Sequence, residues 1–208
     1  HTAYLTAYVS LVRRGNLTKG EALLVHGSTG GVGMAAVQLG KYLGATVIAT
    51  GTSEEKLEFT KKWGADHTLL THKDNIVDFR DEVKDITNGK GADVIYDPVG
   101  GDVFDHSIRC INWGGRLLVV GFASGRIPNL PINMALIKGF SVIGVRAGEY
   151  GRKDPKAGIE NNIAIRKICE EGHFSPYICK EFDLKDAKDA IKFLSERKLV
   201  GKVIIKTN

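Results

Sequence analysis

The sequence predicts a doubly wound α/β fold, in which helices cover both faces of a parallel sheet. Short apolar runs rich in Val, Ile and Leu recur along the chain, without the in–out alternation of a half-exposed antiparallel strand. Segments with helical periodicity separate these runs, as in successive βαβ units. We therefore expect six strands, at Ala22–Val25, Thr46–Ala49, His67–Leu70, Val94–Tyr96, Leu117–Val120 and Val142–Val145.

Start and stop signals of helices lie between these runs. Ser53 is suited to cap a helix, and Glu54 and Glu55 follow it in the first turn, where the helix dipole favours acidic groups. Glycines stand just beyond several periodic segments, where a helix commonly ends in a left-handed residue. We expect crossover helices at Val32–Leu43, Glu54–Trp63, Ile76–Thr87 and Val103–Ile111.

The ends of the chain are less regular than its middle. An amphipathic helix at Leu5–Arg13 precedes the first strand, and a polar stretch at Gly148–Gly158 follows the sixth. After it we expect helices at Ile159–Glu171 and Leu184–Glu196 and a strand at Lys202–Lys206, for which the six-stranded sheet offers no obvious partner. The chain then divides into a linker helix (1–19), the sheet domain (20–146) and a carboxyl-terminal segment (147–208).

Composition excludes several classes of protein. Of the 208 residues, 43% are hydrophobic, which is enough to bury a core and argues against a disordered tail. The three cysteines lack C-x-x-C spacing and are odd in number, so we expect neither a disulfide framework nor a zinc site. No run approaches the roughly 20 apolar residues of a membrane helix, and no signal-peptide pattern opens the chain. We expect a cytoplasmic protein without a membrane partner.

The net charge of +5 is spread over basic residues that are interspersed with acidic ones. No block of like charges marks a nucleic-acid surface, and no stripe of aromatic and arginine side chains does so either. The charge pattern is typical of a solvated surface. We therefore expect no nucleic-acid partner, although single-stranded RNA binding is an alternative for folds of this kind.

A glycine-rich turn joins the first predicted strand to the helix that follows. The segment His26–Gly33 contains Ser28-x-Gly30-x-x-Gly33, a variant of the G-x-G-x-x-G spacing. Glycines let the backbone approach a pyrophosphate, and the start of the helix offers N–H groups and a positive dipole end. Because the turn follows a strand and opens a helix, it predicts a dinucleotide site.

The end of the second strand bears on which dinucleotide binds. An NAD site commonly places an acidic residue there to hold both ribose hydroxyls, whereas this chain has Thr50–Ser53. Without a carboxylate a 2′-phosphate is not repelled, and Lys56 stands one turn into the next helix to attract it. The alternative for Lys56 is a surface lysine that pairs with Glu55. We expect NADPH as the cofactor.

Several motifs together resemble one known family. They run through nearly the whole chain in order, at Val25–Gly33, Ser53–Leu57, Trp63–Asp66, Tyr96–Gly101 and Val120–Ser124. In these residues the chain resembles the quinone oxidoreductase (zeta-crystallin-like) branch of the medium-chain dehydrogenases/reductases, whose cofactor domain is a Rossmann fold. Enoyl reductases share the motifs. The resemblance therefore implies an oxidoreductase without fixing its substrate.

The resemblance also implies which residues contact the cofactor. Gly30, Val32 and Gly33 would meet the pyrophosphate, and Ser53 and Lys56 would hold the 2′-phosphate. Where many members of the family have a tyrosine near the adenosine, this chain has a threonine. The remaining contacts implied are Val99 beside the adenine, Thr6, Gly121, Phe122, Val145 and Arg146 near the nicotinamide, and Arg197 from the carboxyl-terminal segment.

In this family an amino-terminal barrel-like domain covers the nicotinamide and builds the substrate pocket. The chain begins at His1 inside the linker helix, so the resemblance implies a cofactor-binding portion whose last strand returns to the missing domain. The expected activity is zinc-independent, NADPH-dependent reduction of a quinone or an activated alkene. The alternative is a module that binds NADP without turnover.

No side chain is assigned a catalytic role. The histidines lie on separate predicted elements without the spacing of metal ligands, so we expect no metal. His26 is interpreted as a packing residue, and Asp97, which precedes Pro98, as a turn former. The resemblance further implies a homodimer in which the edge strand Ser141–Val145 pairs with its twofold copy.

Overall fold

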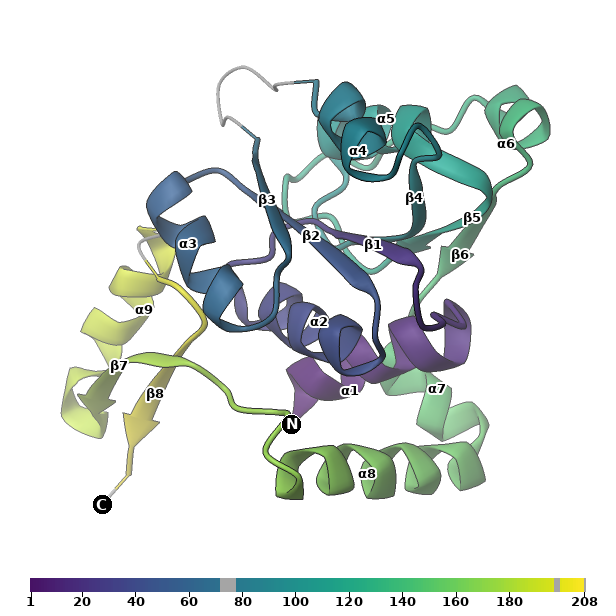
Figure 1. Ribbon diagram of the computed structural model, residues 1–208. Helices are drawn as coiled ribbons and strands as arrows, with labels where there is room; N and C mark the ends of the chain where they lie inside the picture. Colours follow the sequence, from purple (N-terminus) through teal and green to yellow (C-terminus); the bar gives the residue numbers. More distant parts are fainter. Residues whose placement is uncertain (72–77, 197–198, 208) are drawn as a thin grey trace.

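A six-stranded parallel sheet forms the centre of the molecule (Figure 1). The computed structural model describes residues 1–71, 78–196 and 199–207. The strand order is β3-β2-β1-β4-β5-β6, which is the doubly wound order with its switch point between β1 and β4. This confirms the predicted fold class. The strands are β1 (Ala22–Val25), β2 (Thr46–Gly51), β3 (His67–Leu70), β4 (Ala92–Asp97), β5 (Ile111–Val119) and β6 (Ser141–Gly144).

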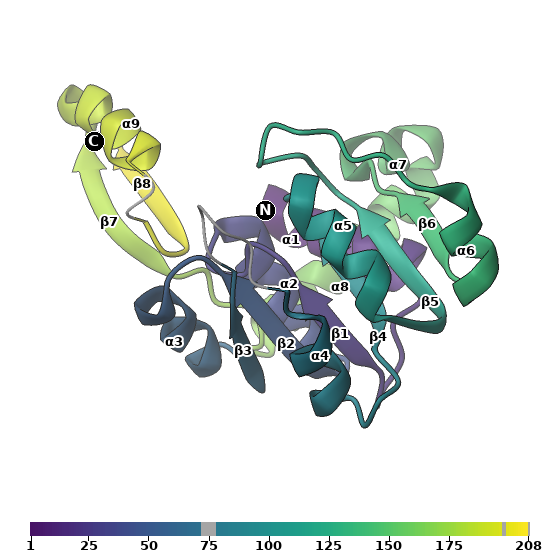
Figure 2. The same cartoon turned by 90° about the horizontal axis from the view of Figure 1, so that it is seen from above.

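The central strands β1, β2 and β4 are mainly apolar because both faces of the sheet are buried there, whereas β3 and β6 at its edges have no fully buried residue. Leu23 and Val25 belong to one hydrophobic core, whereas Leu24 between them belongs to the other. Helices from the two ends of the chain cover the first core, and helices from its middle cover the second, on opposite sides of the sheet (Figures 1 and 2). The crossover helices are α2 (Gly31–Tyr42), α3 (Glu54–Lys62), α4 (Arg80–Ile86), α5 (Gly101–Cys110) and α6 (Ile132–Lys138).

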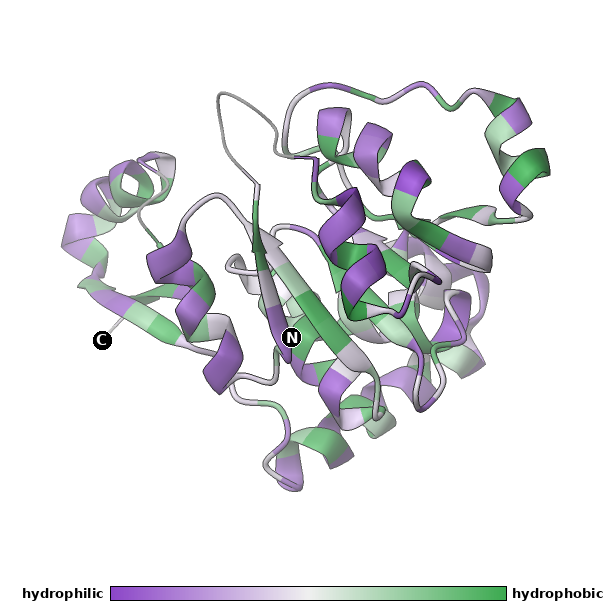
Figure 3. Cartoon of the chain, turned by 45° about the horizontal axis from the view of Figure 1, so that its top comes forward, coloured by the Kyte–Doolittle hydropathy of each residue, from purple (hydrophilic) through white to green (hydrophobic). Residues whose placement is uncertain are grey.

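Figure 3 shows the same pattern in hydropathy, since the central strands are mainly hydrophobic and the surrounding helices carry alternating hydrophobic and hydrophilic residues. Helix α6 was not predicted. All seven of its residues are at least partly exposed, and the apolar side chains of Ile132, Leu136 and Ile137 lie at the surface, so the helix lacks the division into an apolar buried face and a polar exposed face that is typical of an amphipathic helix. It packs against β5 and connects that strand to β6.

Several predicted boundaries are wrong. The linker helix is longer than Leu5–Arg13, because α1 (Thr2–Tyr8) continues directly into a π-helical segment (Val9–Arg14). Helix α5 ends at Cys110 rather than Ile111, and β5 starts at Ile111, six residues before the predicted start, because Ile111 already pairs with Ala92 of β4. Helix α4 starts at Arg80, and part of its predicted range lies outside the described residues.

The polar stretch at Gly148–Gly158 is helical. It forms α7 (Ala147–Lys153) and the first turn of α8 (Pro155–Glu170). The Asp154 side chain accepts a hydrogen bond from the Ala157 N–H, and Pro155 occupies the first helical position, which are two local signals of a helix start. Glycines serve here for close packing, since a Cβ on Gly158 would lie 3.0 Å from the Cα of Gly151.

The carboxyl-terminal strand has a partner that was not predicted. β8 (Lys202–Lys206) pairs in parallel with β7 (Ile178–Asp183), and a short 3-10 turn (Leu184–Asp186) and α9 (Ala187–Ser195) join them. This unit lies at the opposite end of the molecule from α6 (Figures 1 and 2). A bridge between Gly30 and Gly201 connects it to the turn after β1. The final strand is therefore paired, in a sheet of its own.

Candidate functional site

The turn after β1 is built around glycines that the backbone geometry requires. Gly27 has a positive φ of 57°, which is the left-handed region. A Cβ on Gly33 would lie 2.3 Å from the Gly27 carbonyl oxygen, so only glycine fits there. Gly30 is the N-cap of α2 and provides no side-chain cap. The first N–H groups of a helix have no intrahelical acceptor, so this turn is suited to hold an anion.

A cavity of about 550 Å³ opens beside this turn, at the carboxyl ends of the strands. It spans the switch point between β1 and β4, where open α/β sheets bind their ligands. Its wall on the β2 and β3 side consists of small and hydroxyl-bearing residues, and its wall on the β4 side contains two valines. The lining residues are His26, Gly27, Thr29, Thr50, Gly51, Thr52, Thr71, Val99, Gly100, Asp102, Val103, Ala123 and Ser124.

His26 supports the cavity wall from within the core. Its side chain is fully buried, with Nδ1 2.8 Å from the Thr50 hydroxyl and Nε2 2.7 Å from the Ser107 hydroxyl. The Ser107 hydroxyl donates to the Val103 carbonyl, so it accepts from Nε2–H, and Thr50 donates to Nδ1. Burial lowers the pKa of His26 to about 3, so the imidazole is neutral. These contacts agree with a packing role.

Asp97 forms the turn after β4. Its carboxylate accepts hydrogen bonds from the N–H groups of Val99 and Gly100, both at 2.8 Å. Burial raises the pKa of this carboxyl group, and the two backbone donors partly oppose that effect. The side chain is therefore committed to holding Val99 and Gly100 at the cavity, as expected for a turn former.

The end of β2 and the start of α3 form a second polar corner. The Ser53 hydroxyl accepts a hydrogen bond from the Lys56 N–H at 3.4 Å and caps α3. Lys56 is half-buried in the first turn, and the Thr71 hydroxyl after β3 donates to the Gly51 carbonyl at the end of β2. The strand end offers hydroxyl groups and no carboxylate, so a phosphate at this corner meets no acidic group from β2.

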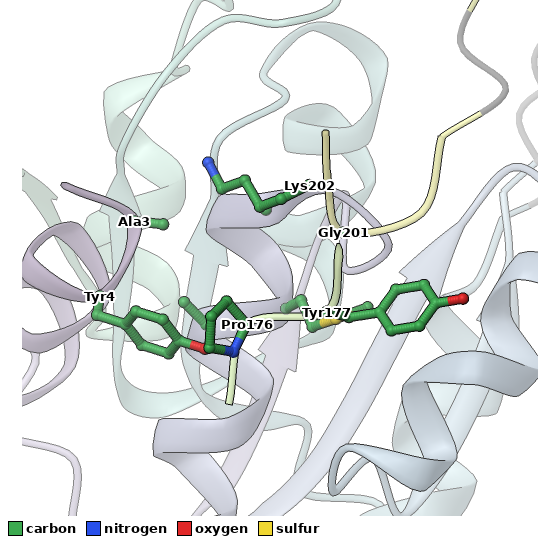
Figure 4. Close-up of a pocket in the computed structure, with 9 residues that line it drawn as sticks. Ala3, Tyr4, Pro176, Tyr177, Gly201 and Lys202 are labelled. Atoms are coloured by element: carbon green, nitrogen blue, oxygen red, sulfur yellow. The ribbon is translucent and has the colours of Figure 1, made fainter. Parts of the chain in front are cut away.

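The carboxyl-terminal segment contacts the glycine-rich turn after β1. The Gly201 N–H donates to the Thr29 carbonyl at 2.8 Å, and the Lys202 N–H donates to the Tyr177 carbonyl at 2.8 Å. A Cβ on Gly31 would lie 2.3 Å from Cε of Lys202, so the lysine side chain lies directly against the start of α2. Figure 4 shows its extended chain, with the ammonium group turned away from Tyr177.

A cavity of about 20 Å³ lies beneath Lys202, between Tyr4 and the carboxyl-terminal segment (Figure 4). This space is about the size of one water molecule, so it is not a substrate pocket. Lys202 is not among the residues that the sequence predicts to contact the cofactor. Its position beside Gly31 depends on contacts between distant parts of the chain, which local sequence does not specify.

The family follows from comparison with known proteins. A family model described as zinc-binding dehydrogenase matches residues 31–161. The chain belongs to this family. Relatives and solved structures named as quinone oxidoreductases also match it, which confirms the resemblance to the quinone oxidoreductase branch of the medium-chain dehydrogenases/reductases.

Relatives of the chain match it over nearly its whole length. A quinone oxidoreductase-like protein 2 homolog from Nematostella vectensis is 36% identical over 99% of this chain and 56% of its own length. The Bos taurus quinone oxidoreductase-like protein 2 is 31% identical over 98% of this chain and 58% of its own length. The chain therefore spans less than two thirds of these relatives.

Solved structures show the same partial coverage. A mycobacterial protein solved in complex with NADPH has a TM-score of 0.89 and 26% identity, over 99% of this chain and 62% of that chain. A quinone oxidoreductase from Pseudomonas syringae has a TM-score of 0.84 and 28% identity, over 98% and 62%. The fold of this dehydrogenase portion agrees with both.

The zinc in the family's description has no matching ligands in the described part of this chain. Zinc in proteins is held by Cys, His and carboxylate groups that converge on one point. Within residues 1–71, 78–196 and 199–207, no three such side chains are placed to hold a metal. Cys110 is buried in the core, where burial raises its pKa to about 12, whereas Cys169 and Cys179 lie on α8 and β7. We therefore propose no zinc-dependent step in the reaction.

The residues expected at the pyrophosphate and the 2′-phosphate occupy two separate corners of this dehydrogenase site. Gly30, Val32 and Gly33 open α2, and Ser53 and Lys56 open α3. The cavity at the strand ends lies between the two helix starts, and Val99, the residue expected at the adenine, is part of its lining.

The residues expected at the nicotinamide lie beyond β5 and β6 and on α1. Gly121 passes close to Pro98, since a Cβ on Gly121 would lie 3.2 Å from the Pro98 carbonyl oxygen. Val145 donates its N–H to the Val119 carbonyl. None of these residues lines the cavity described above, and the Thr6 hydroxyl donates to the Thr2 carbonyl of its own helix. Phe122 and Arg146 are exposed, and Arg197 lies outside the described residues.

Proposed function

We propose that the chain is the NADPH-binding part of an oxidoreductase that reduces a quinone or an activated alkene without zinc. The observation that supports this most is the glycine-rich turn and the adjoining cavity at the switch point, next to a β2 end that lacks a carboxylate. A cofactor that carries a 2′-phosphate fits this combination better than one with two ribose hydroxyls. The mycobacterial neighbour solved with NADPH is consistent with it.

Each helix start holds one charged part of the cofactor. The N–H groups at Val32 and Gly33 and the positive end of α2 bind the pyrophosphate, and the Lys202 ammonium group adds a positive charge beside them. Gly30, whose N–H donates to the Gly27 carbonyl, lets the backbone of the turn approach the pyrophosphate. Ser53 and Lys56 bind the 2′-phosphate. The cofactor is thereby fixed at two points, which orients its nicotinamide end toward Gly121, Phe122, Val145, Arg146 and Thr6.

When bound, NADPH supplies the hydride, and the protein supplies binding and orientation. Thr6 contributes from α1 and Val145 and Arg146 from the end of β6, so the nicotinamide end is held between an amino-terminal helix and the far side of the sheet. The proton that completes the reduction comes from solvent, and no catalytic side chain is assigned. Two relatives are named acryloyl-coenzyme A reductase and 2-haloacrylate reductase, names that denote activated alkenes as substrates.

The alternative is a module that binds NADPH without turnover. The observation that favours it is the coverage of 56% and 58% of the relatives' lengths. Steady-state reduction of a quinone and of an enone by the chain separates the two. Oxidation of NADPH above the rate without protein supports the enzyme, and tight binding without oxidation supports the module.

The edge strand supports a homodimer. β6 is the last strand of the sheet, and Val142 on it is 39% exposed. An open apolar edge favours pairing with another strand, so Ser141–Val145 pairs with the same segment of a second copy. Sedimentation at micromolar concentration tests the dimer, and a monomer alone contradicts it.

In the described part of the chain no helix is long and apolar enough to cross a membrane.

Titration with NADPH and NADH, followed by nicotinamide fluorescence, tests the cofactor site. We expect NADPH to bind at least tenfold more tightly, and Lys56→Glu to remove this preference because it places a negative charge beside the 2′-phosphate. Lys61→Glu is the matched control, since Lys61 lies on the same helix and pairs with Glu58 at the surface. Equal binding of both dinucleotides by the unmodified chain would contradict the assignment of Ser53 and Lys56.

A further inference from the structure

Among the described residues that line the cavity at the strand ends, Asp102 is the one acidic or basic residue apart from the neutral His26. A cofactor with a pyrophosphate and a 2′-phosphate is strongly anionic, so a carboxylate in its site repels those groups. The two phosphate corners lie at the starts of α2 and α3, whereas Asp102 lies in the first turn of α5. Asp102 therefore lies away from both phosphate corners, with its side chain 66% exposed.

The position of Asp102 is held by its neighbours. Arg126 donates a hydrogen bond from Nη2 to Oδ1 of Asp102 at 2.7 Å and also contacts Asp105, one turn further along α5. The loop after β5 lies close to the start of α5, because a Cβ on Gly101 would lie 2.6 Å from the Ser124 hydroxyl. Within the described residues, Oδ2 of Asp102 has no hydrogen-bond donor, so it is available to a ligand.

The surroundings of Asp102 suit a flat base. Val99 and Val103 line the cavity with Asp102 and provide apolar surface, as a base needs for stacking. Thr50, Thr52 and Thr71 line the β2 and β3 side of the cavity, where the Thr50 hydroxyl is bound to His26 and the Thr71 hydroxyl to the Gly51 carbonyl. The ribose would lie along this side, with the exposed Thr52 hydroxyl beside it. An adenine between these walls presents an exocyclic amine, which is a hydrogen-bond donor, and a carboxylate is an acceptor.

We propose that Asp102 accepts a hydrogen bond from the exocyclic amine of adenine and so selects adenine dinucleotides over hypoxanthine dinucleotides. The assignment rests on the proposed function, because it places the adenine of NADPH in this cavity. Hypoxanthine carries a carbonyl oxygen in place of the amine. That oxygen and the Asp102 carboxylate are both acceptors, so they repel each other and the hydrogen bond is lost.

The test compares NADPH with its deamino analogue, reduced nicotinamide hypoxanthine dinucleotide phosphate, by fluorescence titration of the chain. We expect the unmodified chain to bind NADPH about tenfold more tightly, the size of one charge-assisted hydrogen bond at a partly exposed site. Asp102→Asn should reduce or reverse this preference, because an amide can turn its NH₂ toward the carbonyl oxygen of hypoxanthine.

Asp105→Asn is the matched control. It weakens the contact with the same Arg126 guanidinium, but Asp105 is not part of the cavity lining, so the preference for NADPH should persist. Thermal unfolding of both variants shows whether they are folded. The comparison of NADPH with its deamino analogue on the unmodified chain does not depend on the folding of any variant.

Equal affinity of the unmodified chain for the two dinucleotides overturns the assignment alone, and so does an unchanged preference in folded Asp102→Asn. Failure of the unmodified chain to bind either dinucleotide overturns the proposed function together with this assignment.

Discussion

The β1–turn–α2 unit and the carboxyl-terminal β7–α9–β8 unit are stabilised in different ways. Every residue of β1 is buried, and so are eight of the twelve residues of α2. In contrast β7 and β8 contain no fully buried residue, and α9 buries Ala190 alone. A two-stranded sheet is marginally stable by itself. The first unit is therefore specified by its own sequence, whereas the second depends on contacts with other parts of the molecule.

The two units meet at the glycine-rich turn, where we propose that the pyrophosphate of the cofactor binds. The Gly201 N–H donates to the Thr29 carbonyl, and the Lys202 side chain lies against Gly31. The Lys202 ammonium group thus comes from the loosely packed strand β8 and lies beside the well-packed turn after β1. The proposed binding site therefore combines a rigid scaffold with a side chain whose position depends on long-range contacts.

The largest effect is expected from a substitution in the tightly packed unit. Gly33→Ala places a Cβ 2.3 Å from the Gly27 carbonyl oxygen, so the turn or the helix must shift. We expect the free energy of unfolding to fall by about 3 kcal/mol and dinucleotide binding to be lost. Chemical denaturation and NADPH titration measure the two effects.

Gly148→Ala provides the comparison for this substitution. A Cβ on Gly148 has open space around it, and the residue lies in α7 of the carboxyl-terminal segment. Alanine is the better helix former, so this variant should be unchanged or slightly more stable. Equal destabilisation by both variants would show that crowding at Gly33 is not the cause.

A second prediction concerns the pH dependence of the buried scaffold. The pKa of His26 is lowered to about 3 in the folded protein, whereas a histidine in an unfolded chain titrates near 6.5. Between these values the unfolded state binds the proton more tightly, so stability contributed by neutral His26 is complete above about pH 6.5 and is lost as the pH falls toward 3. At pH 5 the loss is about 2 kcal/mol.

Denaturation of the unmodified chain and of His26→Gln at pH 7 and pH 5 measures this contribution. Carboxyl groups change stability over the same range in both proteins, so the difference between them isolates His26. The unmodified chain should lose more stability on acidification than the variant. Equal losses in the two proteins would mean that His26 is not held neutral by burial.

The smallest expected effect lies at the meeting of the two units. Lys202→Ala removes one positive charge beside the start of α2, and we expect NADPH and NADH to bind about fivefold more weakly. Binding of 2′-AMP, which has no pyrophosphate, should be unchanged. Lys206→Ala is the control, because Lys206 lies on the same strand and pairs with Glu181. A weaker affinity for 2′-AMP in Lys202→Ala would point to a general disturbance of the site.

The sequence by itself determined the sheet and the turn. The six apolar runs correspond to the six strands, most clearly at the centre of the sheet, where burial of both faces demands continuous apolar residues. The spacing Ser28-x-Gly30-x-x-Gly33 identified the turn because the steric need for glycine at position 33 is local. The missing carboxylate after β2 could also be found in the sequence alone.

The remaining features depend on the tertiary structure and could not be predicted from local sequence. Helix α6 and strand β7 have no buried residues, so neither shows a periodic buried face, although five of the seven residues of α6 are apolar. The start of β5 at Ile111 follows from pairing with β4, which local sequence does not specify. Lys202 reaches Gly31, and Asp102 lines the cavity, through contacts between residues far apart in the chain. Local sequence specifies periodicity and steric limits, whereas the placement of single polar side chains depends on how distant elements pack.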